Sequence, residues 1–283
     1  MLASFVDSTS SVLVQQGASA AAADMGWLDD SMAADVSPSG DALLMNARFG
    51  NVGAYYIRKL DGSPPVKLGD GTAEAWSPDG QQILAQTGTT TTVLTSVGPG
   101  TPRTIAHPDT TSFFGWYLPD GRILLNGQRQ TTTWRFFLLD PEGRIRPVGP
   151  DGLDHWVGQH VPSDDGTLLA AYASGHNDAA NPIVIPLAGG QAVSTAGFKR
   201  DEVVVRFTPD NQHLLVYDRD RLPVRVYALD YRTGARSLWR EFMPGDPTGI
   251  RGVKSIVMSP GGGVVAYNYT RELSTLYLIN GLR

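Results

Sequence analysis

Trp76-Ser77-Pro78-Asp79-Gly80 contains the element that decides the fold, because versions of its last four residues recur six times along the chain. Proline presets φ at the second position, aspartate can bond the nearby backbone, and glycine or asparagine accepts a positive φ, so each copy predicts a tight turn. The third residues of the copies lie at 39, 79, 120, 165, 210 and 261, which are 40 to 51 residues apart. The six turns occupy residues 37–40, 77–80, 118–121, 163–166, 208–211 and 259–262.

Strand-forming sequence surrounds these turns. An apolar residue usually precedes the turn, as at Trp76, and a short β-forming run follows it, as at Ile83-Leu84-Ala85. Further β-forming runs complete the first unit at 55–60 and 65–68, and no long segment has the 3.6-residue helical period. Four strands per unit is the size of one propeller blade. The sequence therefore predicts an all-β, six-bladed β-propeller with four-stranded antiparallel blades, forming a single domain over residues 1–283.

The last unit is short of one strand. Its third predicted strand, 276–279, ends just before the C-terminal Arg283. We expect residues 1–24 to provide a closing strand at 11–15 and a linker, because an open outer edge would invite aggregation. The alternative is that 11–15 is only a tail.

Composition excludes several classes of protein. The 283 residues are 41% hydrophobic with a net charge of −5, which allows a sizeable core and offers no basic block for nucleic acid. The absence of cysteine excludes disulfide scaffolds, thiolate zinc sites and cysteine nucleophiles. No run of 18 apolar residues occurs, and residues 1–25 lack the basic start and apolar middle of a signal peptide. We expect a monomer without a membrane span, cytoplasmic if expressed alone.

Longer phrases resemble a known family. The turn with an aromatic before it resembles the propeller repeats of the Tol-system translocation protein. The phrases at 25–29, 57–69, 238–250 and 273–282 resemble the C-terminal propeller of serine/threonine protein kinases from soil bacteria, mainly acidobacteria. The resemblance runs from about residue 25 to the end. It implies a sensor-like, extracytoplasmic domain joined to a kinase through a membrane helix.

The catalytic half of such a kinase is missing from this sequence. No Gly-rich nucleotide loop, H-R-D or D-F-G motif occurs, so we expect no kinase activity. The sequence would then be an excised module, a truncated reading frame or a stand-alone relative.

Polar residues just before the turns are expected to face the central channel, where innermost strands share an axis. Counting back three residues from the first turn residue gives Glu74 and His160, and counting back two gives Asp35 and Arg206. Loops that lead into these strands add further polar residues. The predicted ligand-binding set is Glu74, Asp154, Trp156, Asp201, Glu202 and Arg206.

Three histidines are candidate metal ligands. His107, His155 and His160 precede the third and fourth turns, and with a carboxylate such as Glu74 or Asp154 they could hold a divalent metal. Such a metal would lower the pKa of a bound water to about 7. One alternative is that each imidazole bonds a loop carbonyl. Another is a buried structural ion pair between Glu74 and Arg206.

Four tryptophans lie near the starts of innermost strands: Trp27, Trp76, Trp116 and Trp156. Aromatic side chains dominate packing between blades, and we expect most of the four to pack there. Trp156, beside Asp154 and His155, is expected at a binding mouth.

Two functional hypotheses follow, beside a purely structural scaffold. The first is a binding module that takes a small molecule or a protein at the channel mouth. The second is a hydrolase in which metal-bound hydroxide attacks an ester, lactone or phosphotriester, which rests on analogy of fold. The motifs G-x-S-x-G, H-E-x-x-H and D-x-D-x-D-G are absent, so the sequence favours the binding module.

Overall fold

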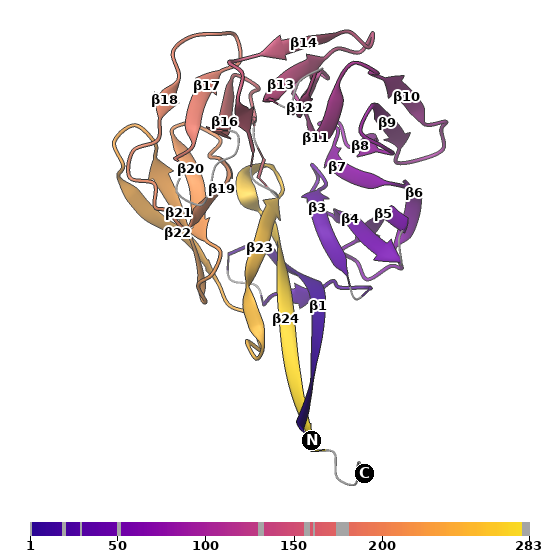
Figure 1. Ribbon diagram of the computed structural model, residues 1–283, viewed down its shortest axis with the longest axis vertical. Coiled ribbons are helices and arrows are strands. Elements are labelled where there is room, and N and C mark those ends of the chain that lie inside the picture. The colour runs from indigo at the N-terminus through magenta and orange to yellow at the C-terminus, as the bar shows by residue number, and fades with distance from the viewer. Residues whose placement is uncertain are drawn as a thin grey trace.

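The computed structural model describes residues 2–18, 21–28, 30–49, 52–129, 133–155, 159–160, 162–173 and 181–278. The described strands form six four-stranded antiparallel sheets around a common axis (Figure 1). This arrangement confirms the predicted six-bladed propeller.

Five blades use strands that are consecutive in the chain and run from the axis outward. The first blade contains β3 (Ser31–Val36), β4 (Ala42–Phe49), β5 (Val52–Lys59) and β6 (Val66–Asp70); the second β7 (Thr72–Trp76), β8 (Gln82–Gln86), β9 (Thr91–Ser96) and β10 (Arg103–Ala106); the third β11 (Thr111–Tyr117), β12 (Ile123–Gln128), β13 (Trp134–Leu139) and β14 (Ile145–Val148); the fourth β15 (Leu153–Asp154), β16 (Leu168–Ala173), β17 (Ile183–Pro186) and β18 (Val193–Ser194); the fifth β19 (Glu202–Phe207), β20 (His213–Asp218), β21 (Val224–Asp230) and β22 (Arg236–Phe242).

The sixth blade joins both ends of the chain, which confirms closure of the ring by the N-terminal segment. Its order from the axis is β23 (Ile250–Met258), β24 (Val264–Leu278), β1 (Leu2–Gln16) and β2 (Ala23–Asp24). The prediction that 276–279 turns back as a third strand is wrong. Residues 264–278 contain no glycine or proline to reverse the chain, so they form one long strand. The N-terminal segment therefore supplies two strands rather than one.

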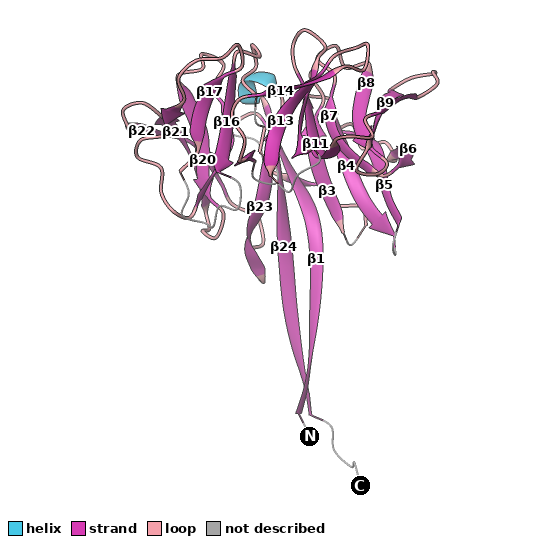
Figure 2. Cartoon of the chain, turned by 45° about the horizontal axis from the view of Figure 1, so that its top comes forward, coloured by secondary structure: helices cyan, strands magenta, loops and turns pink. Residues whose placement is uncertain are grey.

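The strands β1 and β24 extend beyond the blade as a two-stranded ribbon. They pair continuously from Gln16 with Val264 to Leu2 with Leu278, whereas β23 accompanies β24 only as far as Arg271. The ribbon leaves the face opposite the short 3-10 turn η1 (Pro260–Gly262), as Figure 2 shows.

The repeated turns adopt the predicted conformation. Gly80 and Gly121 have φ of 70° and 82°, which confirms the expectation of positive φ at these turns. In the second turn, the hydroxyl of Ser77 donates to Asp79 over 2.6 Å and accepts from the amide of Gln82 over 2.8 Å. These bonds close the loop between β7 and β8.

The core lies between neighbouring blades. One cluster joins Leu44 and Ile57 of the first blade to Ile83 of the second, and all three side chains are buried. Another joins Val12 and Val14 of β1 to the first blade. Burial of these apolar surfaces is the main favourable term in holding the ring together.

Each blade is also tied to the next by a side chain near the end of its second strand. The amide of Asn46 bonds both backbone groups of Ala73, and the amide of Asn268 bonds both backbone groups of Ala33. The remaining ties are Gln86 to Ser112, Asn126 to Leu153, Tyr172 to Val204 and Tyr217 to Val253. This position follows the last turn residue by six, or by five in the third blade, so it belongs to the repeat.

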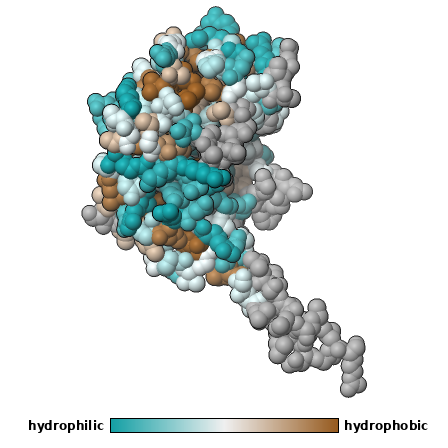
Figure 3. All heavy atoms as spheres, turned by 60° about the vertical axis from the view of Figure 1, so that its left-hand side comes forward, coloured by the Kyte–Doolittle hydropathy of each residue, from teal (hydrophilic) through white to brown (hydrophobic). Residues whose placement is uncertain are grey.

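The outer surface carries only scattered large apolar side chains. Val66 of β6 and Leu238 of β22 are 60% and 55% exposed. Figure 3 shows one side of the molecule, where hydrophobic patches are separated by hydrophilic residues. Scattered apolar residues are normal on a protein surface. The concave feature of interest lies instead on the propeller axis.

Candidate functional site

An axial cavity of about 360 Å³ is lined by residues from all six blades. The lining includes the first residue of one innermost strand, Thr72 of β7, and the last residue of another, Met258 of β23. Of the sequence-predicted site residues, Glu74, His155, His160 and Arg206 line this cavity. A volume of this size falls within the range of small-molecule pockets.

A β-bulge sets the position of Glu74. In the pairing of β7 with β8, Ala73 lies opposite Ala85 and Ala75 lies opposite Leu84, which leaves Glu74 as an extra residue. Equivalent bulges leave Ala34 in β3 and Val205 in β19 without a partner. A bulge disrupts the ladder and re-aims a side chain. All three bulge residues line the cavity.

Glu74 is the outstanding polar group of the cavity. Within the described part of the chain, its carboxyl takes part in no hydrogen bond or ion pair. Burial raises the pKa of Glu74 well above its usual value, because no charge or donor compensates for the lost hydration. A polar group in this condition has its bonding capacity available for a ligand.

Asp35 is a second half-buried carboxyl in the lining, and it is held by the backbone. Its two oxygens accept hydrogen bonds from the amides of Val36 (2.8 Å) and Trp76 (2.9 Å). Burial raises the pKa of Asp35 to about 6, although both bonds oppose this rise. The predicted ligand-binding set omits Asp35, although it has the same turn-relative position as Arg206.

Arg206 lines the cavity and is paired with protein groups. Its Nη1 donates to the carbonyl oxygens of Met258 over 2.8 Å and Ser259 over 3.4 Å, and its Nη2 donates to Asp164. The proposed ion pair between Glu74 and Arg206 is therefore wrong, because Asp164 is the carboxylate that Arg206 contacts.

His160 is a neutral imidazole. Its Nδ1 donates to the carbonyl of Pro162 over 3.0 Å, which leaves Nε2 as an acceptor. Burial, and then the charge of Arg206, lower the pKa of His160 to about 4. This histidine thus remains uncharged at neutral pH.

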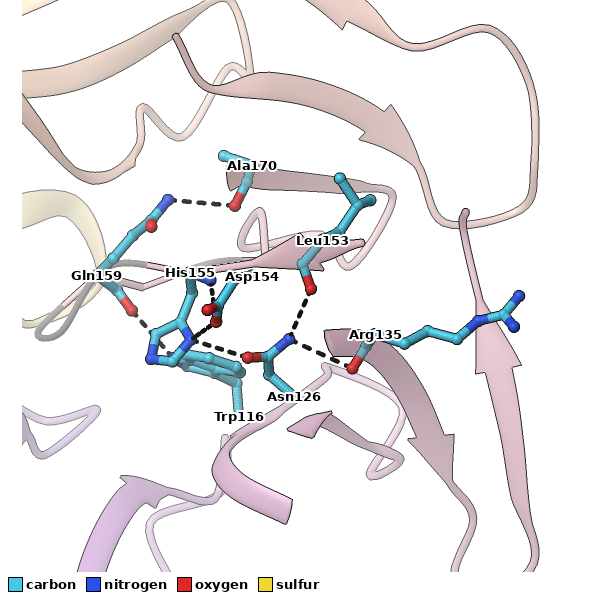
Figure 4. A network of polar contacts seen from close by, with 8 residues as sticks. All are labelled: Trp116, Asn126, Arg135, Leu153, Asp154, His155, Gln159 and Ala170. Carbon is cyan, nitrogen blue, oxygen red and sulfur yellow. Dashed lines mark hydrogen bonds and ion pairs between the residues drawn. The ribbon is translucent and has the colours of Figure 1, made fainter. Parts of the chain in front are cut away.

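His155 is fixed by a polar network that crosses from the third blade to the fourth (Figure 4). Its Nδ1 lies 3.1 Å from Oδ1 of Asn126 and 3.2 Å from Oδ1 of Asp154. Asn126 donates to the carbonyls of Leu153 and Arg135, so its oxygen faces the imidazole as an acceptor. Asp154 therefore orients His155 and is not itself in the cavity lining.

Two aromatic rings line the cavity around His155. The ring centroids of Phe114 and Trp116 lie 4.1 and 5.1 Å from that of the imidazole. Trp116 Nε1 donates to the carbonyl of Gln159, whose own amide donates to Ala170 (Figure 4). Phe114 and Gln159 were missed from the sequence, since neither has a distinctive position in the repeat.

Other predicted residues lie away from the cavity lining. His107 is buried, where Nδ1 donates to the carbonyl of Thr110 and Nε2 accepts from the hydroxyl of Thr92. Glu202 forms an ion pair with Arg236 over 2.5 Å. Asp201 is exposed in a turn, and Trp156 lies outside the described residues.

The histidine and carboxylate side chains do not assemble into a metal site in the part of the chain that the structure describes. No group of three or more His, Cys, Asp or Glu side chains there could hold an ion. The bonding of His107 instead matches the alternative in which an imidazole bonds a loop carbonyl. The described residues therefore provide no ligand set that fits the candidate divalent metal.

The tryptophans divide between the core and the surface. Trp76 and Trp116 are buried, as expected for packing between blades. Trp27 is 45% exposed and contacts Tyr56 edge-on with centroids 4.8 Å apart, so it does not share the burial of Trp76 and Trp116.

Solved structures share the fold of this chain. A protein described provisionally as TolB from Agrobacterium tumefaciens superposes with a TM-score of 0.62 at 20% identity, over 94% of this chain and 99% of that one. TolB from Acinetobacter baumannii gives 0.54 at 14% identity, over 94% of this chain and 66% of that one. An oligogalacturonate lyase from Vibrio parahaemolyticus gives 0.56 at 13% identity, over 89% and 70%.

These similarities establish a TolB-like propeller architecture, since identities this low carry the fold alone. No protein-family profile matches the chain, and no curated protein matches it in sequence. Among the described segments, no helix has the length and apolar character that a membrane crossing requires.

Proposed function

We propose that this chain is a small-molecule-binding propeller module, with the axial cavity as its binding site. The observation that carries the proposal is the carboxyl of Glu74, which projects from a bulge into the cavity and has no partner among the described residues. Burying such a group costs free energy unless a ligand bonds to it. Sites that bind ligands commonly keep groups of this kind.

The proposed role is that of a sensor. The resemblance to the C-terminal propellers of bacterial serine/threonine kinases supports this role and an extracytoplasmic location. In such an assembly the propeller would bind the ligand, and a kinase on the other side of a membrane would respond. The hydrolase alternative lacks comparable support, because the described residues offer no metal-ligand group. The contact of the Thr92 hydroxyl with His107 is buried and lies outside the cavity lining.

A cavity-filling variant tests the proposed function. Ala34 occupies the bulge position of the first blade and lines the cavity, so Ala34→Phe should fill part of it. The matched control is Ala235→Phe, at an exposed position in the loop between β21 and β22. Both variants and the unmodified chain are screened by thermal shift against small amines, alcohols, sugars and carboxylates.

The expected result is at least one compound that stabilises the unmodified chain and Ala235→Phe but not Ala34→Phe. Stabilisation follows mass action, so a compound at 100 times its Kd adds about 2.7 kcal/mol to the free energy of unfolding. If every stabilising compound acts equally on Ala34→Phe, the cavity is not the binding site and the proposal is wrong.

A further inference from the structure

Several side-chain donors that line the axial cavity bond to the protein itself, whereas the hydroxyl of Thr72, an exposed residue, has no bond among the described residues. Trp116 Nε1 donates to Gln159, the amide of Gln159 donates to Ala170, and the guanidinium of Arg206 donates to Met258, Ser259 and Asp164. A ligand that brings acceptors would therefore compete with bonds already made. Breaking such bonds leaves buried groups unsatisfied and is costly.

The cavity lining also contains hydrogen-bond acceptors that are available to a ligand. Both oxygens of Glu74 lack a donor among the described residues, and the Nε2 of His160 is an acceptor because Nδ1 carries the proton. Asp30 and Asp35 add two more carboxyls to the lining. Arg206, whose guanidinium is the one that the described residues bring to the lining, is paired with Asp164.

Aromatic rings complete the chemical character of the cavity. Phe114 has no polar atom, and the only polar atom of the Trp116 ring is committed to Gln159. The rings therefore offer a ligand apolar contact and an electron-rich π system. Cations are attracted to the faces of such rings by about 0.5 to 2 kcal/mol.

We infer that the axial cavity takes an organic cation: a protonated amine on a small apolar or aromatic body. This inference rests on the proposed function and names the ligand class of the same site. An ammonium group has three donors and no acceptor, which matches a cavity rich in acceptors. Glu74 is the residue that would contact the ammonium, and the rings near His155 would contact its apolar body.

Proton release should accompany binding. A cation beside Glu74 favours the ionised carboxylate, whose pKa is raised by burial in the empty cavity. The other titratable groups of the lining are Asp30, Asp35, His155 and His160, beside the charge of Arg206. Asp35, with a pKa of about 6, acts in the same direction, whereas His160 stays neutral above its pKa of about 4. Affinity for a cation should thus rise with pH as these carboxyls ionise.

Three probes of one shape test the inference: benzylammonium, benzyl alcohol and benzoate. Each is titrated into the full chain at pH 7.5, with binding followed by ligand-observed NMR. We expect benzylammonium to bind at least tenfold more tightly than benzyl alcohol, and benzoate to bind more weakly than both. Glu74→Gln should reduce benzylammonium affinity at least fivefold and leave benzyl alcohol unchanged. Glu241→Gln, which removes the same charge at an exposed site on β22, should have no effect.

The outcomes separate this inference from the proposed function. If benzyl alcohol or benzoate binds as tightly as benzylammonium, and Ala34→Phe abolishes that binding, the cavity is a site but the ligand class is wrong. If benzylammonium binding survives Ala34→Phe, or is unaffected by Glu74→Gln, the cation inference is wrong. If no probe binds, the cation inference is wrong, and the thermal-shift screen with Ala34→Phe decides the proposed function separately. Should Glu74→Gln not fold, the ranking of the three probes and their response to Ala34→Phe still decide.

Discussion

The amide of Asn268 should make one of the largest single polar contributions to closing the ring. Its Nδ2 donates to the carbonyl of Ala33 over 2.9 Å and to the hydroxyl of Ser255 over 2.6 Å, and its Oδ1 accepts from the amide of Ala33 over 2.8 Å. All three residues are at most 3% exposed. These bonds connect β24 of the sixth blade to β3 of the first, two strands that are 228 residues or more apart in the sequence.

Replacement by alanine would leave two buried backbone groups of Ala33 without a partner. Each unsatisfied buried group costs roughly 1–3 kcal/mol, so Asn268→Ala should lower the free energy of unfolding by about 3 kcal/mol. The matched control is Asn46→Ala, which removes the same pair of bonds to Ala73. Asn46 is partly exposed and lines the cavity, where water can replace it, so we expect a loss of about 1 kcal/mol.

Urea unfolding followed by tryptophan fluorescence measures both variants. The decisive quantity is the shift of the urea midpoint. If the slope m, the dependence of the free energy of unfolding on urea concentration, stays constant, the shift reports lost stability and not a changed unfolded state. A loss below 1 kcal/mol for Asn268→Ala, or a larger loss for Asn46→Ala, would refute the role of buried amides in joining the blades.

Three further perturbations have defined outcomes. Gly80→Val should lower the free energy of unfolding by more than 1 kcal/mol, because φ is 70° at Gly80 and valine would strain the backbone there. The control Gly98→Val should be nearly neutral, since Gly98 has neither a positive φ nor a close neighbour. Equal melting temperatures for the two variants would contradict this prediction. Deleting residues 1–24 removes β1 and β2 and exposes an edge of β24, so size-exclusion chromatography should show aggregates. A monomer with an unchanged melting temperature would show that the N-terminal strands do not protect this edge. Folding favours the protonated form of Asp35, so the contribution of Asp35 to the free energy of unfolding falls as the pH rises from about 4 to 6. Folding favours the neutral form of His160, so the contribution of His160 increases as the pH rises from about 4 to 6.5. Asp35→Asn should therefore make the melting temperature rise more steeply with pH in this window, and His160→Gln should make it rise less; slopes that do not change would show that neither group titrates as described.

Most parts of the fold that were predictable from sequence are local, and ring closure was inferred from the strand that the last unit lacks. A turn such as 77–80 contains its own proline and glycine, so its geometry follows from neighbouring residues. The long strand β24 was mispredicted because a strand end without a turn residue depends on its partner, here β1. Strand pairing between the two ends of a chain leaves no local signal.

The site was predictable in position and less so in chemistry. Counting back from the turns located Glu74, His160 and Arg206 on the axis, since the repeat fixes where innermost strands end. The hydrogen-bonding partners of these residues could not be located by counting from the turns. Asp164 reaches Arg206 across 42 residues of sequence, and Arg236 reaches Glu202 across 34, so two predicted ligand-binding side chains are paired by tertiary contacts.

The repeat separates positions that hold the fold from positions that can vary. The turn residue with positive φ, a glycine in five blades and Asn211 in the fifth, and the inter-blade tie recur because every blade needs both. The bulge position places no such demand on its side chain: Ala34, Glu74 and Val205 occupy it in three blades, and the ladder resumes after each of them. A side chain at the bulge can therefore acquire a ligand-binding role with little effect on stability. It follows that Glu74→Gln should change binding while leaving the urea midpoint nearly unchanged, the opposite of what Asn268→Ala should do.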